Sequence, residues 1–249
     1  MSTSSTASIV KPVDSLWTRL LVDPVAVPLA RRLARVGAVT PNRVTAVAGA
    51  LGVLSAGLFA VGRPRLAGVV FMVHFLADCV DGKVARARGT SSTRGQALDY
   101  TFDTFTGALN YGALGWWLAR QGSLEIVAPI LLVGMSGWFV WILEYRKHLA
   151  DRVGVPGGGR AGTSSRYPRV VRPWVDWCAR RGYIPVPYSV EVEQFTLGVA
   201  PLALPTRGMA VTIWLAIAFY VLASGVNLRR IWRLARQGDD DRASRESAV

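Results

Sequence analysis

"DCVDGKVARARGTSSTRGQALDYTFD", residues 78–103, lies between two strongly apolar runs, "AGVVFMVHFLA" before it and "TFTGALNYGALGWWLA" after it. The stretch contains four aspartates, three glycines and several basic residues. Ionisable groups placed within membrane-spanning segments are costly, and they mark functional sites. The pattern therefore predicts a polar site set into a membrane protein.

The rest of the chain has the composition of a membrane protein. Of its 249 residues 51% are hydrophobic, and the apolar residues come in blocks. A helix needs roughly 20 mostly apolar residues to cross a bilayer. The sequence predicts an all-α integral membrane protein with six transmembrane helices at about 42–62, 66–86, 95–119, 124–145, 191–204 with its flanks, and 208–228. The fifth is the shortest and contains Pro201.

The positive charge of the chain is distributed unevenly about these spans. The net charge is +13, and 25 of the 29 Lys and Arg residues fall on one side of the predicted membrane. Basic residues gather in cytoplasmic loops of membrane proteins. We therefore expect both termini and residues 78–103 to face the cytoplasm, and the asymmetry argues against nucleic acid as the partner of the basic residues.

Three regions follow from this topology, and the second contains a long cytoplasmic loop. Residues 1–39 form a cytoplasmic segment with an amphipathic interfacial part, which Pro24 and Pro28 are expected to break into short helical pieces. Residues 40–230 form the membrane domain. Within it, the cytoplasmic loop of about 147–190 combines a Gly/Ser linker with a surface helix in "RPWVDWCARRGY". Residues 231–249 form a cytoplasmic tail, and its end, "RQGDDDRASRESAV", is expected to be disordered.

Both ends of the opening stretch have helical spacing. Each end places its aspartates and small residues along one helical stripe: Asp78, Asp81 and Ala85 on the first, and Gly95, Asp99 and Asp103 on the second. The connector 87–94 is short, so the two helices are expected to run antiparallel with their carboxylates facing each other.

Four carboxylates at close quarters repel one another unless a cation neutralises them. Oxygen-rich sites of this kind suit hard divalent cations such as Mg²⁺, which are often completed by substrate phosphates. Gly82, Ala85 and Gly95 could let helices approach closely or let a flat ligand such as a nucleotide lie against them. Arg86 could pair with a phosphate. The alternative is a solvated loop, which four aspartates at helical spacing disfavour.

These residues resemble the CDP-alcohol phosphotransferase family, whose motif is D-x2-D-G-x2-A-R-x8-G-x3-D-x3-D. Every fixed position is matched within 78–103, and "TPNRVT" at 40–45 resembles the opening of the family's first membrane helix. The resemblance implies transfer of a substituted phosphoryl group from a CDP-linked donor, usually CDP-diacylglycerol, to an alcohol, with release of CMP. This is a reaction of phospholipid biosynthesis.

The resemblance also implies roles for single residues and an assembly. The four aspartates, Asp78, Asp81, Asp99 and Asp103, would bind two Mg²⁺ or Mn²⁺ ions, and Asp103 would also be the general base. The CDP pocket would be lined by Gly82, Ala85, Arg86 and Gly95. A homodimer is expected, and "GALGVLSAG" offers a close-packing face for it, although the same face could pack inside the monomer.

Other polar residues give weaker indications. Arg146 and Lys147 could hold an acceptor phosphate or anchor the helix end, and Glu191 and Glu193 could recognise acceptor hydroxyls or merely begin a helix. His74 is expected to be a packed core residue. The sequence does not name the acceptor. The alternative function is a transporter or channel that uses the acidic cluster as a cation site, but its charges would spread over more than two adjacent helices.

Overall fold

The computed structural model describes residues 9–155, 168–185 and 188–246. Its regular structure over these residues is helical, apart from an isolated parallel bridge between Asp14 and Tyr183. The elements are η2 (Thr18–Val22, a π-helical turn), α1 (Asp23–Ala34), α2 (Pro41–Ala60), α3 (Pro64–Arg88), α4 (Thr93–Arg120), α5 (Val127–Arg152), α6 (Arg172–Arg181), α7 (Ser189–Glu193), η5 (Gln194–Val199, also π-helical), α8 (Ala200–Ala203) and α9 (Thr206–Glu246). The predicted all-α class is confirmed.

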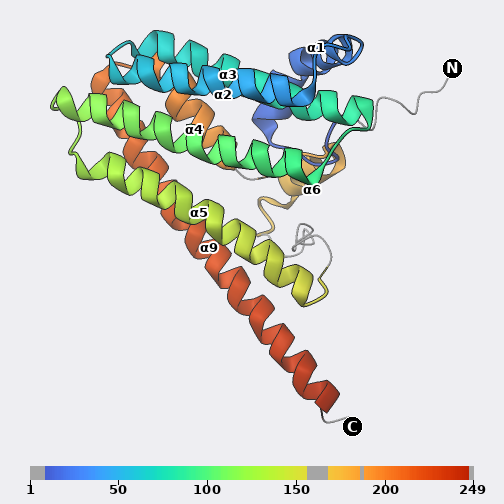
Figure 1. Ribbon diagram of the computed structural model, residues 1–249. Coiled ribbons are helices and arrows are strands. Elements are labelled where there is room, and N and C mark those ends of the chain that lie inside the picture. Colours follow the sequence, from blue (N-terminus) through green and yellow to red (C-terminus); the bar gives the residue numbers. More distant parts are fainter. Residues whose placement is uncertain (1–8, 156–167, 186–187, 247–249) are drawn as a thin grey trace.

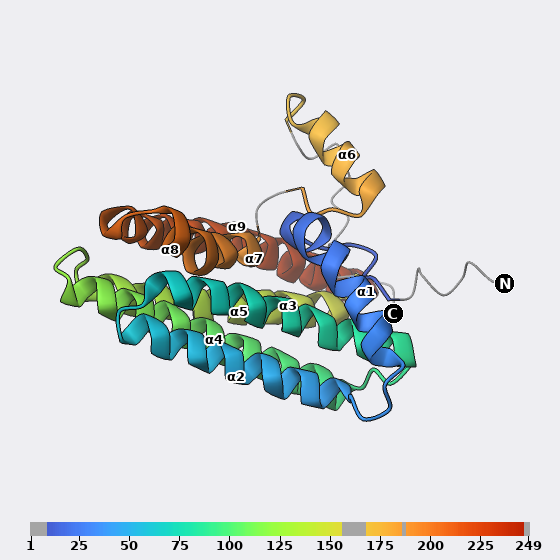
Figure 2. The same ribbon diagram turned by 90° about the horizontal axis from the view of Figure 1, so that it is seen from above.

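The long helices form a bundle in which α2 packs against both α3 and α4 (Figures 1 and 2). On the other side α4 packs against α5, and α5 packs along α9, which extends beyond the bundle toward the C-terminus. The short helical run of α7, η5 and α8 packs on α3 and α9, while α1 crosses the end of α3 (Figure 2). The site stretch 78–103 therefore lies at the end of the bundle that α1 covers.

A helix corresponds to each of the six predicted spans, but length and composition single out three of them. These are α2, α5 and the part of α9 from Thr206 to Asp240, which are long and apolar enough to cross a membrane. Helices α3 and α4 have 25 and 28 residues but carry the charged stretch, and the helical run 189–203 is short. The same charges that form the site thus weaken the membrane signal of two helices.

The turn between α3 and α4 follows from three residues. Gly89 ends α3 with φ 65°, a left-handed conformation that glycine adopts without the cost of a side chain. Ser92 then caps α4 by accepting a hydrogen bond from the Gly95 N–H at 3.0 Å. The chain reverses over residues 89–92, as the short connector predicted.

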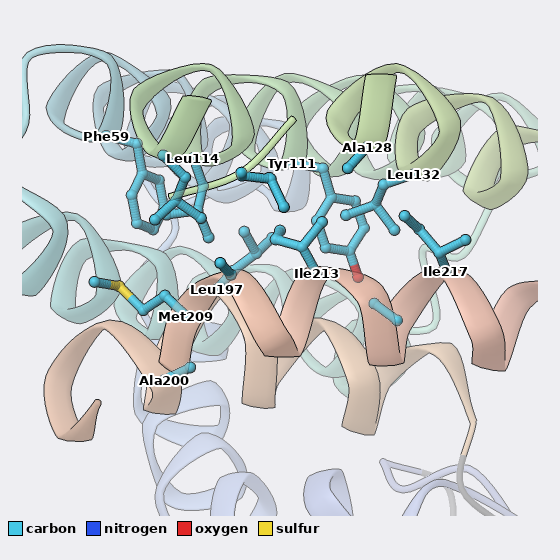
Figure 3. Packing of buried hydrophobic residues seen from close by; sticks show 14 of the residues in the cluster. Phe59, Tyr111, Leu114, Ala128, Leu132, Leu197, Ala200, Met209, Ile213 and Ile217 are labelled. Carbon is cyan, nitrogen blue, oxygen red and sulfur yellow. The ribbon is translucent and has the colours of Figure 1, made fainter. Parts of the chain in front are cut away.

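The core between the helices is aromatic and aliphatic (Figure 3). Phe59, Leu114, Leu197 and Ile213 are fully buried there. Tyr111 is also buried, and its hydroxyl lies 3.1 Å from that of Tyr220, so each hydroxyl has a polar partner inside the apolar core.

Glycines bring several helices into close contact. A Cβ at Gly52 would lie 2.8 Å from the Thr106 side chain on α4, and one at Gly115 would overlap the Pro129 side chain on α5. Gly49 meets Phe102 of α4 in the same way. The "GALGVLSAG" face is therefore used at its first two glycines for packing within the chain, and those positions offer no separate surface for a homodimer.

Two expectations about the chain ends are wrong. Pro24 and Pro28 do not break the N-terminal segment, because residues 16–34 form one helical run. Pro24 stands at the start of α1, where a missing N–H is tolerated, and the buried Ala26 and Ala30 hold the helix against α3.

The expected disordered end is also helical up to Glu246. Gly238 lies against Val153, the residue that follows α5, so the packing of α9 extends beyond its own apolar part. The surface helix of the 147–190 loop is present as α6, whereas most of the predicted Gly/Ser linker lies outside the described residues.

Candidate active site

Three of the four motif aspartates converge. Asp78 of α3 and Asp99 and Asp103 of α4 each offer a carboxylate oxygen, and these atoms lie within 4.8 Å of one another. Asp99 and Asp103 are one helical turn apart, so they share a face of α4. Asp78 and Asp99 are half-buried, while Asp103 is exposed. Of the first predicted stripe, Asp78 therefore meets Asp99 and Asp103 of the second.

The fourth aspartate occupies a different environment. Asp81 is only 4% exposed, and its Oδ2 accepts a hydrogen bond from the Thr45 hydroxyl at 2.5 Å. Thr45 belongs to α2, the helix that packs against both α3 and α4. Sequence reasoning gave Thr45 no role, although it is the last residue of the "TPNRVT" segment. It links that segment directly to the aspartate motif.

The cluster fits a divalent cation. Three carboxylates that converge at this distance repel one another, and Oδ1 of Asp99 is buried without a hydrogen-bond partner among the described residues. Buried polar atoms that lack partners are uncommon in folded proteins, and a bound ion often satisfies them. Carboxylate oxygens are also the ligands that Mg²⁺ and Mn²⁺ prefer.

The residues expected to line a nucleotide pocket do not serve helix packing. A Cβ at Gly82 would first meet Nη1 of Arg86 at 3.2 Å, and one at Gly95 would meet only Oγ of Ser92, also at 3.2 Å. Ala85 is half-buried on the same helix as Gly82. The sequence left two roles open for these glycines, close helix packing or room for a ligand. The surroundings of Gly82 and Gly95 fit the second role better.

Arg86 itself is held by the N-terminal segment. Its guanidinium lies over Gly82, and its Nε donates a hydrogen bond to the carbonyl oxygen of Ile9 at 2.7 Å. The motif arginine thus fills part of the space beside the motif glycine. No signal in the sequence indicated this contact, because 77 positions separate the two residues.

The two candidate acceptor residues have other partners. Nη1 of Arg146 donates to Oδ1 of Asn227 on α9 at 2.7 Å. Nζ of Lys147 pairs with Oε1 of Glu144, one turn earlier on α5, at 2.5 Å. His74 is buried and its Nδ1 lies 2.8 Å from the Ala48 carbonyl, so it is the packed residue that the sequence suggested.

Glu193 adds a fifth carboxylate near the same face of α4. A Cβ at Gly107 would lie 3.4 Å from Oε1 of Glu193, and Gly107 follows Asp103 by one helical turn. Glu193 comes from α7, at the start of the helical run 189–203. The sequence placed it at a helix start, and the tertiary structure places it beside the stripe of Asp99 and Asp103.

Comparison with known proteins now identifies the family. The family model described as CDP-alcohol phosphatidyltransferase matches residues 38–170, which include α2, α3, α4 and α5. The chain belongs to the CDP-alcohol phosphatidyltransferase family. This membership agrees with the complete motif in 78–103, and it argues against the alternative of a transporter or channel.

Two relatives match the chain over different lengths. A phosphatidylinositol phosphate synthase of Mycobacterium marinum is 30% identical over 208 residues, which cover 82% of this chain and 78% of that protein. A bifunctional IPC transferase and DIPP synthase of Rubrobacter xylanophilus is 38% identical over 101 residues, 39% of this chain and 23% of that protein.

Solved structures share the fold as well. A crystal structure of the phosphatidylinositol phosphate synthase of Mycobacterium tuberculosis with CDP-DAG bound has a TM-score of 0.59 and 25% identity, covering 84% of this chain and 94% of that chain. A structure of the same enzyme in complex with manganese and citrate has a TM-score of 0.58 and 24% identity, covering 84% of this chain and 89% of that chain.

Proposed function

We propose that this enzyme transfers a phosphatidyl group from CDP-diacylglycerol to the hydroxyl of an acceptor, with release of CMP, in phospholipid biosynthesis. The observation that carries the proposal is the convergence of Asp78, Asp99 and Asp103 within the segment that matches the family. The crystal structure of the mycobacterial relative with CDP-DAG bound supports a lipid-linked CDP donor.

The aspartates would hold the metal. Asp78, Asp99 and Asp103 would ligate Mg²⁺ or Mn²⁺ directly, and Asp81, held by Thr45, would complete a site for two ions. Bound divalent ions would neutralise the donor's diphosphate and stabilise the departing CMP. The manganese complex of the mycobacterial enzyme supports this assignment.

Asp103 would also be the general base. Asp103 is the exposed residue among the three converging aspartates, and Glu193 lies near the same face of α4, where the acceptor would approach. It would take the proton of the acceptor hydroxyl as that oxygen attacks the phosphorus distal to cytidine.

The nucleotide would lie against Gly82, Ala85, Arg86 and Gly95. For this, the Arg86 guanidinium has to swing away from Gly82, which requires loss of its contact with the Ile9 carbonyl. A freed guanidinium presents N–H donors that match a phosphate group. The Ile9 carbonyl therefore lies beside the proposed position of the nucleotide.

Inositol phosphate is the first candidate for the acceptor, because the relatives that cover most of the chain are phosphatidylinositol phosphate synthases. Arg146 and Lys147 would be the candidate residues for the acceptor's phosphate.

A second candidate is a polyol without a phosphate, and Glu193 favours it. The carboxyl oxygens of Glu193 can accept hydrogen bonds from hydroxyls, but they offer a phosphate no positive charge. The two candidates therefore differ in the charge that the acceptor brings to this side of α4.

The membrane topology would comprise six spans, with α3, α4 and the run 189–203 joining the three apolar helices inside the bundle. Both termini, the aspartates and the 147–190 loop would face the cytoplasm, with 1–39 and 231–249 as flanking segments. A homodimer remains part of the proposal, supported by resemblance to the family alone.

The test is a CMP-release assay on the purified enzyme with CDP-diacylglycerol and a panel of acceptors. Inositol phosphate and inositol are the decisive pair, assayed with the wild type and with Glu193→Gln. A preference for inositol phosphate that Glu193→Gln increases would support the first candidate. A preference for inositol that Glu193→Gln abolishes would support the second. The absence of CMP release with every acceptor would overturn the proposed reaction.

A further inference from the structure

A cleft lies between the N-terminal helices and the loop that follows α6. Its volume is about 470 Å³, and no motif aspartate lines it. Its lining includes Arg19, Arg181 and Tyr183, together with the apolar side chains of Pro24, Val27 and Pro28. The cleft therefore combines two guanidinium groups with an apolar wall.

The charge in this cleft is positive. Asp23 also lines it, but this carboxylate is 8% exposed and forms an ion pair with Nζ of Lys83 at 2.9 Å. Lys83 is itself only 3% exposed, so its charge neutralises Asp23 rather than a ligand. Arg19 lies 3.6 Å from the same carboxylate, and Arg181 has no acidic partner among the described residues. A net positive charge remains for a ligand.

The walls of the cleft are joined to each other. Asp14 N–H donates to the Gly182 carbonyl, and Ile184 N–H donates to the Asp14 carbonyl, each at 3.0 Å. Arg19 donates to the carbonyls of Lys11 and Pro12. These contacts tie the N-terminal segment to the loop after α6, so the cleft exists before any ligand enters.

The guanidinium of Arg181 also lies over an aromatic ring. It lies 4.4 Å from the centre of the Trp177 ring. A guanidinium stacked on an aromatic face keeps its N–H donors at its edge, which is the geometry that a phosphate oxygen requires. The stacked arginine is thus oriented as well as charged.

Both helices beside the cleft have exposed apolar side chains. On η2 and α1 these are Leu20, Leu21, Val25 and Leu29, and on α6 Trp174 is exposed. Helices with this character lie in the interface of a membrane. The cleft would thus open where phosphate headgroups are concentrated, and its proline and valine wall suits the apolar part of an amphipathic ligand.

We propose that this cleft binds a phosphate group, with Arg19 and Arg181 as the charged donors. The phosphate could belong to an anionic phospholipid at the membrane surface or to a soluble phosphate ester. The cleft is separate from the aspartate cluster, so its occupancy can be measured without the transfer reaction. Arg181 is the better residue to vary, because Arg19 also holds the N-terminal segment.

The experiment compares Arg181→Gln with Arg180→Gln in the full-length enzyme. Arg180 directly precedes Arg181 in the same helix, is exposed and does not line the cleft, so both variants lose the same charge from α6. In one arm, nanodiscs of phosphatidylcholine with added phosphatidylglycerol are analysed by native mass spectrometry for retained phosphatidylglycerol. In the other, inorganic phosphate is titrated calorimetrically into enzyme in neutral nanodiscs.

We expect Arg181→Gln to weaken binding about tenfold or more in at least one arm, as loss of a charged hydrogen bond does, and Arg180→Gln to leave it unchanged. A loss confined to phosphatidylglycerol identifies a lipid headgroup, and a loss with inorganic phosphate identifies a phosphate ester. Any phosphate bound at the aspartate cluster contributes equally to both variants. Equal effects of the two substitutions, or no effect of either, would overturn the proposal.

Discussion

The hydroxyl of Thr45 donates a hydrogen bond to Oδ2 of Asp81 at 2.5 Å, and the two residues come from different helices. This bond joins Asp81 of α3 to α2, whereas the carboxylates of the other three motif aspartates converge on one another. Thr45 thus acts on the candidate metal site through Asp81. Outer residues of this kind commonly change metal affinity by about 10–100-fold when they are removed.

Thr45→Val should lower the affinity of the enzyme for Mn²⁺ by about tenfold or more, because Asp81 would lose the donor that orients it. Thr45→Ser keeps the hydroxyl and should stay close to the wild type. The measurement is the Mn²⁺ dependence of CMP release, with the Mn²⁺-induced shift in melting temperature as a readout independent of turnover. Equal Mn²⁺ affinity in the valine variant and the wild type would show that Thr45 does not position Asp81 for metal binding.

Asp103→Asn should lower kcat by about 10²–10⁴-fold, because the amide cannot take the acceptor's proton. It retains one oxygen for a cation, so the binding of CDP with Mn²⁺ should weaken less than turnover does. Asp78→Asn is the comparison, since it should weaken nucleotide binding as well. Calorimetry with CDP and Mn²⁺ beside the CMP-release assay checks both, and near wild-type turnover of Asp103→Asn would remove the base assignment.

EDTA should abolish turnover, and added Mg²⁺ or Mn²⁺ should restore it. The physical reason is the mutual repulsion of Asp78, Asp99 and Asp103, whose carboxylates converge within 4.8 Å. The assay is CMP release in chelator, followed by titration of each ion. Full activity in chelator would contradict the metal assignment.

Cysteine labelling should place the two ends of α5 on opposite sides of the membrane. The native Cys79 and Cys178 are first replaced by serine, and single cysteines are then introduced as Gln121→Cys and Asp151→Cys, both at exposed positions. In intact cells the cysteine at position 121 should react with an impermeant maleimide, and that at 151 only after permeabilisation. The reverse pattern would place the aspartates on the outer side.

Gly115→Ala should destabilise the bundle by about 1–3 kcal/mol, since overpacking in a tight core has that cost. The new Cβ would overlap the Pro129 side chain, where α4 meets α5. Gly134→Ala on α5 is the matched control, because a Cβ there meets nothing within 4 Å. Thermal unfolding in detergent should show a lower melting temperature for the first variant and not for the second.

The sequence by itself determined the all-helical class, the antiparallel turn at residues 89–92 and the family. These depend on local spacing: Asp99 and Asp103 share a helix face because they are four residues apart, and Gly89 and Ser92 end one helix and begin the next. Hydropathy could indicate six helices but not how many of them span the membrane, because α3 and α4 carry the charges of the site.

Only the tertiary structure decided which distant residues meet these aspartates. Thr45 reaches Asp81 because α2 packs against both α3 and α4, and Glu193 reaches Gly107 because the run 189–203 lies in the bundle. Arg86 is held by Ile9, which only the path of the N-terminal segment could reveal. Local spacing carries no information on such contacts, since packing between separate helices positions their side chains.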